Sequence, residues 1–151
     1  MAHPAWVRKL FTDRDLDDIA ATVGRVERAT SAELRVHLEE RLPRGVDPLQ
    51  RAQALFQRLG MHRTRGRNGV LVYLALEDHK LAVLGDEAIH ARVGPAYWEH
   101  VRDLMVGHLR AGASRDAVVL AVEELGRVLA AHFPQSGGDE PDELSNRVST
   151  E

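Results

Sequence analysis

The fold of this chain is decided by residues 62–87, whose sequence is HRTRGRNGVLVYLALEDHKLAVLGDE. Its centre, residues 70–76, is an unbroken run of apolar and aromatic side chains. Such a run is typical of a strand that other elements cover on both faces, so we expect it in the middle of a sheet. The EDHK turn that follows predicts a tight hairpin, and residues 81–85 should return as an antiparallel strand.

Another strand is expected before this run. Residues 32–39 alternate between apolar and polar side chains, which predicts a strand with one polar face, nearer the edge of the sheet. Between the two strands, Asp47 is a good N-cap, Pro48 suits the first helical position and Gly60 suits the end of a helix. A helical crossover of this kind should be right-handed and make the two strands parallel.

Helices are also expected before and after the strands. Thr12 is a good N-cap for the first helix, and residues 86–93 suit a short helix or turn. Pro95 should open a longer helix, and Ser114 should cap a last one that ends before Pro134. This order predicts an α/β fold in which a small mixed sheet of three to four strands has helices on both faces.

Composition indicates one domain with an acidic tail. The 151 residues are 44% hydrophobic, enough for one buried core. Residues 1–134 should form the domain. Residues 135–151 are polar and acidic, so we expect them to be disordered. Residues 134–151 have a net charge of -4 and the rest of the chain +1, which argues against nucleic-acid binding.

Location is predicted from what the sequence lacks. The chain has no cysteine, so disulfides and thiolate metal sites are excluded. The first residues contain no apolar run long enough for a signal peptide, and no apolar stretch is long enough to cross a membrane. We therefore expect a cytoplasmic protein without a membrane span.

The expected topology brings three polar segments to one end of the sheet. If the first two strands are parallel and the third runs back, residues 30–33, 65–69 and 85–87 meet there. We call these three segments the charged rim. Arginines, an asparagine between glycines and three acids would share this end of the molecule.

The charged rim predicts two kinds of binding. Arg65 and Arg67, with the flexible backbone N–H groups around Gly66 and Gly69, suit an anion such as phosphate. Arg67 and Asn68 are the catalytic candidates of this segment. Asp86, Glu87 and Glu33 offer the oxygen ligands that calcium or magnesium prefers. Together they suit hydrolysis of a phosphoester, in which a metal or arginines stabilise charge on the transferred group. The alternative is a solvated turn whose charges pair at the surface.

His90 is the one histidine of the eight that we retain as a general acid or base, because it follows Asp86 closely. No H-E-x-x-H pair, G-x-S-x-G, Walker sequence or G-x-G-x-x-G is present, so nucleotide cofactors and serine-type catalysis are disfavoured. The opposite end of the sheet competes as a site, because ligands often bind at the carboxyl ends of parallel strands. The candidates there are Glu39, Glu40, Glu77, Asp78 and His79.

An ordered set of motifs along nearly the whole chain resembles the TPM domain family, and in particular its short bacterial branch. The motifs are Thr30-Ser31-Ala32-Glu33-Leu34, Phe56-Gln57-Arg58-Leu59-Gly60-Met61 with Thr64, Arg67-Asn68-Gly69-Val70-Leu71, Gly85-Asp86 with Ile89-His90, Tyr97-Trp98, His132-Phe133-Pro134 and Asp142-Glu143-Leu144-Ser145-Asn146.

The resemblance implies a three-layer α/β/α sandwich of Rossmann-like appearance. Plant members of the family are also called thylakoid acid phosphatase domains and take part in photosystem II maintenance, and another relative modulates a receptor in nematodes. Two functions remain open for this chain. One is a weak, metal-assisted acid phosphatase acting on phosphomonoesters. The other is a non-catalytic module that binds a partner protein through the charged rim or the acidic tail.

Overall fold

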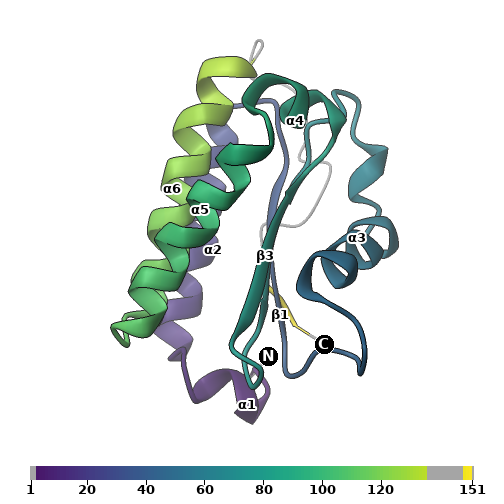
Figure 1. Cartoon of the computed structure of the whole chain (residues 1–151). Helices are drawn as coiled ribbons and strands as arrows, with labels where there is room; N and C mark the ends of the chain where they lie inside the picture. Colours follow the sequence, from purple (N-terminus) through teal and green to yellow (C-terminus); the bar gives the residue numbers. More distant parts are fainter. Residues whose placement is uncertain (1–2, 136–147, 151) are drawn as a thin grey trace.

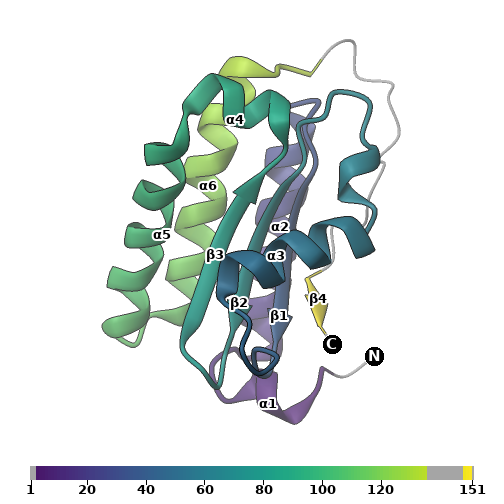
Figure 2. The same cartoon turned by 45° about the vertical axis from the view of Figure 1, so that its right-hand side comes forward.

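The computed structural model describes residues 3–135 and 148–150 and is built on one four-stranded sheet. The strands lie side by side in the order β3-β2-β1-β4 (Figures 1 and 2). Their bounds are Leu34–Glu39 for β1, Val70–Ala75 for β2, Lys80–Gly85 for β3 and Ser149–Thr150 for β4. The predicted small mixed sheet is confirmed.

Helices cover both faces of the sheet. On one face lie α2, α5 and α6, and on the other lies α3, so the predicted three-layer α/β/α arrangement is confirmed (Figures 1 and 2). The bounds are Ala5–Arg8 for α1, Asp13–Arg28 for α2, Pro48–Arg58 for α3, Glu87–Val93 for α4, Pro95–Arg110 for α5, Ser114–His132 for α6 and Met61–Arg63 for the 3₁₀ helix η1.

The strand directions agree with the sequence patterns. β1 and β2 are parallel, with Leu34 opposite Val70, and β3 returns antiparallel, with Gly85 opposite Val70. The starts of β1 and β2 and the end of β3 therefore lie at one end of the sheet. The crossover through α3 and the tight hairpin account for these directions.

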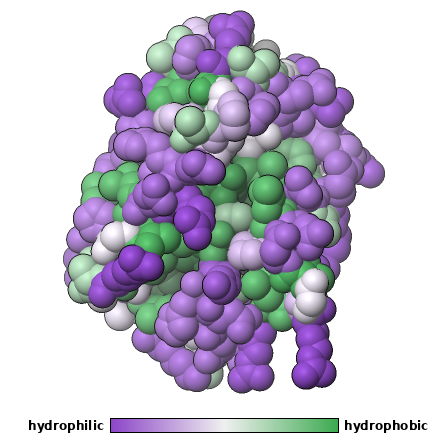
Figure 3. Space-filling model, viewed as in Figure 1, coloured by the Kyte–Doolittle hydropathy of each residue, from purple (hydrophilic) through white to green (hydrophobic). Residues whose placement is uncertain are grey.

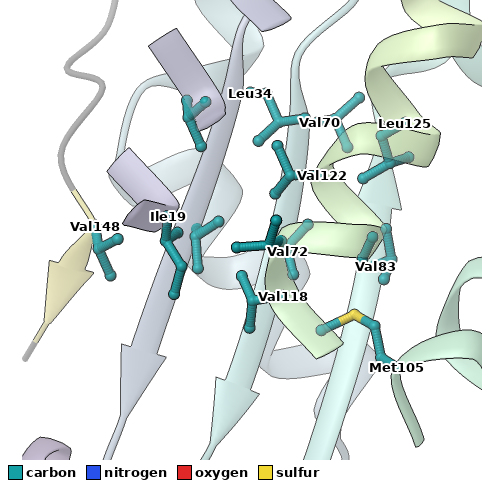
Figure 4. Packing of buried hydrophobic residues seen from close by; sticks show 14 of the residues in the cluster. Ile19, Leu34, Val70, Val72, Val83, Met105, Val118, Val122, Leu125 and Val148 are labelled. Atoms are coloured by element: carbon teal, nitrogen blue, oxygen red, sulfur yellow. The ribbon is translucent and has the colours of Figure 1, made fainter. Parts of the chain in front are cut away.

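The core lies on both faces of β2, and every residue of this strand is buried. Val72 faces α6 and packs in the larger cluster with Val118 and Val122 (Figure 4). Tyr73 belongs to the smaller cluster against α3, which includes Phe56. This two-sided burial is why the strand has no alternation of apolar and polar residues.

The helix caps are mostly those that the sequence predicts. Thr12 and Asp47 each accept a hydrogen bond from the backbone three residues later and form capping boxes. Gly60 has a φ of 73°, the left-handed conformation that commonly ends a helix. Ser114 is a correction: it is the first residue of α6, Ala113 occupies the cap position, and no side chain caps the helix.

Residues 148–150, near the end of the acidic tail, lie against the sheet. Val148 is buried, and Ser149 pairs with His37 as β4 adds parallel to the outer edge of β1. The expectation that residues 135–151 are disordered stays a prediction, because most of them lie outside the described part of the chain. Residues 136–147 lie outside the described part of the chain, so the domain boundary stays a prediction. No helix in the described ranges has both the length and the apolar character needed to cross a membrane.

Candidate functional site

Backbone hydrogen bonds join the three segments of the charged rim, as the topology predicts. Val70 N–H donates to the carbonyl of Glu33 at 2.8 Å, and Asp86 N–H donates to the carbonyl of Gly69 at 2.9 Å. Ala88 N–H, in the first turn of α4, donates to the carbonyl of Arg67 at 3.0 Å. The sheet ladder and the start of α4 thus hold the rim in place.

Arg67 is the centre of the exposed part of the rim. Its backbone has a φ of 50°, an uncommon left-handed conformation for a residue other than glycine. Its Nε lies 3.3 Å from Oδ2 of Asp86 and 3.9 Å from Oε1 of Glu87. The Asp86 side chain is 8% exposed and that of Glu87 is 71% exposed, so the guanidinium lies between an inner and an outer carboxylate.

Asp86 also begins α4. Its Oδ1 accepts the N–H of Glu87 at 2.7 Å, and Asp86 occupies the N-cap position of the helix. Each oxygen of this carboxylate therefore has a donor within the protein. The sequence predicts Asp86 and Glu87 as cation ligands, and the structure places them together but gives Asp86 a structural role as well.

Asn68 lies inside the rim and not on its surface. It is 2% exposed, and its Nδ2 donates to Oγ of Ser31 at 3.4 Å. Its Oδ1 has no hydrogen-bond partner among the described residues. A Cβ at Gly66 would come within 2.8 Å of the Asn68 amide, so a larger residue there would require the Asn68 side chain to shift. Burial does not favour the predicted catalytic role of Asn68, which stays a prediction.

Glu33 is also buried, at 5% exposure, where its segment enters β1. Across residues 3–135 and 148–150, no three His, Asp or Glu side chains come together as a metal-binding group. Glu33, Asp86 and Glu87 therefore form no preassembled set of ligands. The predicted calcium or magnesium site stays a prediction.

His90 lies one helical turn after Asp86, but its ring contacts α5. The indole Nε1 of Trp98 donates to Nδ1 of His90 at 2.9 Å, and the two rings are stacked. Because Nδ1 accepts this hydrogen bond, a neutral His90 carries its proton on Nε2. As a general acid His90 would need a proton on both nitrogens, and as a base a free nitrogen, and either state requires the Trp98 hydrogen bond to be given up. Both predicted roles therefore stay predictions.

The competing site at the opposite end of the sheet is a buried structural network. Glu39 accepts Nε of Arg51 at 2.9 Å, Nη2 of Arg51 at 2.5 Å and the hydroxyl of Tyr73 at 2.7 Å. Burial alone would raise the pKa of Glu39, but the hydrogen bonds from Arg51 and Tyr73 outweigh burial and lower it. Burial and the bond to Glu39 raise the pKa of Tyr73.

The side chains of Glu77 and Asp78 at that end are engaged in local contacts. Glu77 pairs with Lys9 at 2.9 Å, and this hydrogen bond lowers the pKa of Glu77. Asp78 accepts the backbone N–H of Leu42 at 2.6 Å, and the carbonyl of Glu40 accepts the N–H of Glu77. These contacts join the hairpin to its neighbours, which is the turn role that their sequence suggests.

The sequence patterns missed a large apolar groove along β3. It has a volume of about 960 Å³ and runs between α5 and α3. We call it the β3-edge groove, and the lining residues that matter below are Leu10, Pro48, Leu49, Lys80, Leu81, Val83, His90, Trp98, Glu99, Arg102, Val106, Leu109 and Arg110. One signal was available: the apolar stripe of α3 begins at Leu49, a turn before its first buried residue, Ala52.

Comparisons with known proteins agree with this fold. The model of the TPM domain family matches residues 7–128. The BA42 protein of the psychrophilic bacterium Bizionia argentinensis, solved by NMR, is 33% identical, with a TM-score of 0.84 over 93% of this chain and 95% of that one.

Two more distant NMR structures share the fold. The N-terminal domain of cg2496 from Corynebacterium glutamicum is 18% identical, with a TM-score of 0.64 over 85% of this chain and 80% of that one. The N-terminal domain of a P. gingivalis protein is 16% identical, with a TM-score of 0.69 over 84% and 83%. A comparison with curated proteins gave no match. The match to the family model over most of the sequence shows that this chain belongs to the TPM domain family.

Proposed function

We propose that the charged rim binds phosphomonoesters together with a divalent cation and hydrolyses them slowly. The observation that supports this proposal is the position of Arg67 between Asp86 and Glu87, at 3.3 and 3.9 Å. An arginine beside two carboxylates is the combination of charges that a phosphate and a cation would each recognise.

In this proposal the three side chains exchange their partners on binding. Arg67 would turn from the carboxylates to the phosphate, for which its half-exposed guanidinium has room. Asp86 and Glu87 would then hold the cation, as magnesium is commonly held by one or two carboxylates and substrate phosphates. A bound cation would neutralise charge on the phosphoryl oxygens. Water would attack the phosphorus as the bond to the leaving oxygen breaks. His90, protonated on both ring nitrogens after it gives up the Trp98 hydrogen bond, would donate its Nε2 proton to that oxygen.

An assay with p-nitrophenyl phosphate from acid to neutral pH tests the proposal, with magnesium, calcium or EDTA present. Asp86→Asn is the informative variant, because asparagine caps a helix as well as aspartate but carries no charge. Arg67→Gln removes the phosphate ligand. Each should lower kcat/KM by about 10- to 100-fold, as expected for a lost hydrogen bond to a charged group.

The matched control is Arg14→Gln, which removes an exposed arginine on α2, outside the charged rim, and should leave the rate unchanged. Wild-type turnover no greater than that of Asp86→Asn, with every cation, would rule out the phosphatase. That result would favour the other hypothesis, a non-catalytic module that binds a partner protein. The predicted route through the acidic tail falls mostly on residues 136–147, outside the described part. The β3-edge groove favours a binding role independently.

A further inference from the structure

The chain covers one edge of its sheet and leaves the other open. β4 pairs with the outer edge of β1, whereas no strand in residues 3–135 or 148–150 pairs with the outer edge of β3. The hydrogen bond from Asp86 N–H to Gly69 sets the alternation along β3. In an antiparallel pair, successive residues point their backbone groups alternately inward and outward. The N–H and C=O groups of Leu81, Val83 and Gly85 therefore point outward, away from β2.

This edge has few of the features that usually prevent pairing. Exposed edge strands are commonly protected by charged side chains, proline or bulges. Residues 81–85 are LAVLG, with no proline and no charge, and the pairing of β3 with β2 runs without interruption from Lys80 to Gly85. Such an edge is a template for another extended segment.

The groove supplies apolar walls on both sides of the edge. Trp98, Val106 and Leu109 line it from α5, and Pro48 and Leu49 line it from α3. Figure 3 shows apolar atoms gathered in the middle of this face, between hydrophilic margins.

Exposed apolar side chains concentrate here. Leu49 is 48% exposed and Leu10 is 38% exposed, and both line the groove. Among the described residues, only one other large hydrophobic side chain, Leu120, is classed as exposed. A gathering of exposed apolar side chains in a concave surface marks a binding site.

We propose that the β3-edge groove binds an extended segment of a partner protein, which adds to the sheet as a fifth strand antiparallel to β3. The outward backbone groups of β3 can form hydrogen bonds with one added strand. The apolar walls from α5 and α3 suit apolar side chains that point alternately to the two sides of that strand. The walls leave less room for the edge of a second folded sheet. β3 has six residues, so the paired segment should span about 20 Å.

The charged residues that line the groove indicate which end of the bound segment should be acidic. Lys80 and Arg110 are exposed at the hairpin end of the groove and have no ion pair among the described residues. Arg102 already contacts Asp103 at 3.6 Å, and Glu99 lies toward the other end, beside Trp98. The segment should therefore carry acidic residues at its C-terminal end, which lies against Lys80 in the antiparallel arrangement.

A tethered probe tests this proposal in the full chain. Helix α1 lies under the hairpin, where Lys9 contacts Glu77 at 2.9 Å, and the chain begins on the β4 side of this helix (Figure 2). A linker that passes under the end of the sheet lets an N-terminal extension reach the groove. The probe alternates valine with threonine, ends in two aspartates and precedes residue 1 through a flexible Gly/Ser linker. Such a linker gives a local concentration of about 1 mM.

The readout is the hydrogen-exchange rate of single backbone amides, measured by NMR. The outward amides of Leu81, Val83 and Gly85 should exchange more slowly than in the chain without the probe. The inward amides of Ala82 and Leu84 should change little. A probe whose Kd equals the local concentration slows exchange of the outward amides about twofold. A probe whose Kd is ten times lower than the local concentration slows it about tenfold.

Control probes and variants distinguish strand pairing with β3 from a nonspecific effect of the tethered probe. A probe with proline at alternate positions keeps the length and charge but cannot pair, and it should have no effect. Lys80→Glu with Arg110→Glu should return exchange toward the rate without the probe, and a probe ending in two lysines should restore protection. Arg14→Glu, an exposed change on α2 outside the groove, should do nothing. Slowing below twofold, or equal slowing by the proline probe, would overturn the proposal.

Discussion

Replacing Arg51 with methionine tests the buried network between α3 and β1. Arg51 donates twice to Glu39, whose side chain is only 10% exposed. The methionine keeps most of the apolar volume but leaves the carboxylate with the Tyr73 hydroxyl as its hydrogen-bond donor. The variant therefore isolates the cost of a buried carboxylate without its cation.

We expect Arg51→Met to lower the free energy of unfolding substantially. Removing one partner of a buried ion pair costs about 3–5 kcal/mol, and the slight exposure of Glu39 favours the lower end of that range. We expect the free energy of unfolding to fall by about 3 kcal/mol. For a chain of this length, that corresponds to a decrease in Tm of about 6–12 °C.

The cost should also depend on pH. In the wild type the pKa of Glu39 is lowered, so its stabilising contribution is present above the unfolded-state pKa and is lost as the pH falls through the folded-state value. In Arg51→Met, burial dominates and raises the pKa of Glu39. Protonation then relieves the buried charge, so the difference in stability between the two proteins should narrow as the pH falls.

Urea denaturation at neutral and mildly acidic pH, followed by tryptophan fluorescence, measures both effects. The control is the double variant Glu39→Gln/Arg51→Met, which removes the charge together with its partner and should recover more than half of the loss. A decrease below about 1 kcal/mol at neutral pH would refute the reasoning, because surface ion pairs already account for that much. A double variant as unstable as the single one would refute it as well.

Three further predictions concern stability. Gly126→Ala should cost about 1–2 kcal/mol in urea denaturation, because its Cβ would lie 2.5 Å from Cγ2 of Val26 and this clash outweighs the gain in helix propensity. Burial lowers the pKa of His37 to about 4, so His37 should contribute up to about 3 kcal/mol of stability above pH 6.5 that is lost as the pH falls toward 4. Unfolding at a series of pH values should show that His37→Asn has a smaller slope in this range. Thr12→Ala removes a capping box with Asp15 and should lower the free energy of unfolding by about 1 kcal/mol.

Each of these has its own control. Adding Val26→Ala to Gly126→Ala should restore stability, and no recovery would contradict the clash. An unchanged pH slope in His37→Asn would show that other groups control acid unfolding. Thr12→Ser keeps the hydroxyl and should be neutral, so a loss as large as that of Thr12→Ala would exclude the cap as the cause.

The layered architecture and the rim were predictable because they depend on local patterns and simple topology. The apolar run at residues 70–76 requires cover on both faces, and the tight hairpin requires an antiparallel return. With those two constraints, Arg67 and Asp86 must end at the same end of the sheet. No knowledge of side-chain packing was needed for that step.

What the patterns missed depends on contacts between distant segments. Asn68 is buried because its loop folds over Ser31, and His90 contacts Trp98 on another helix. β4 contains only Ser149 and Thr150, too few residues for any periodicity to show. The groove is a space between α3 and α5, and only the final packing of these helices creates it.

The pairing of β4 with β1 has a consequence for folding during synthesis. His37 and Ser149, which contact each other through their side chains, are 112 residues apart in sequence. The ribosome therefore releases β1, β2 and β3 well before the strand that covers the edge of β1. During that interval both edges of the nascent sheet are open, so this stage of synthesis is the most exposed to strand pairing between neighbouring chains.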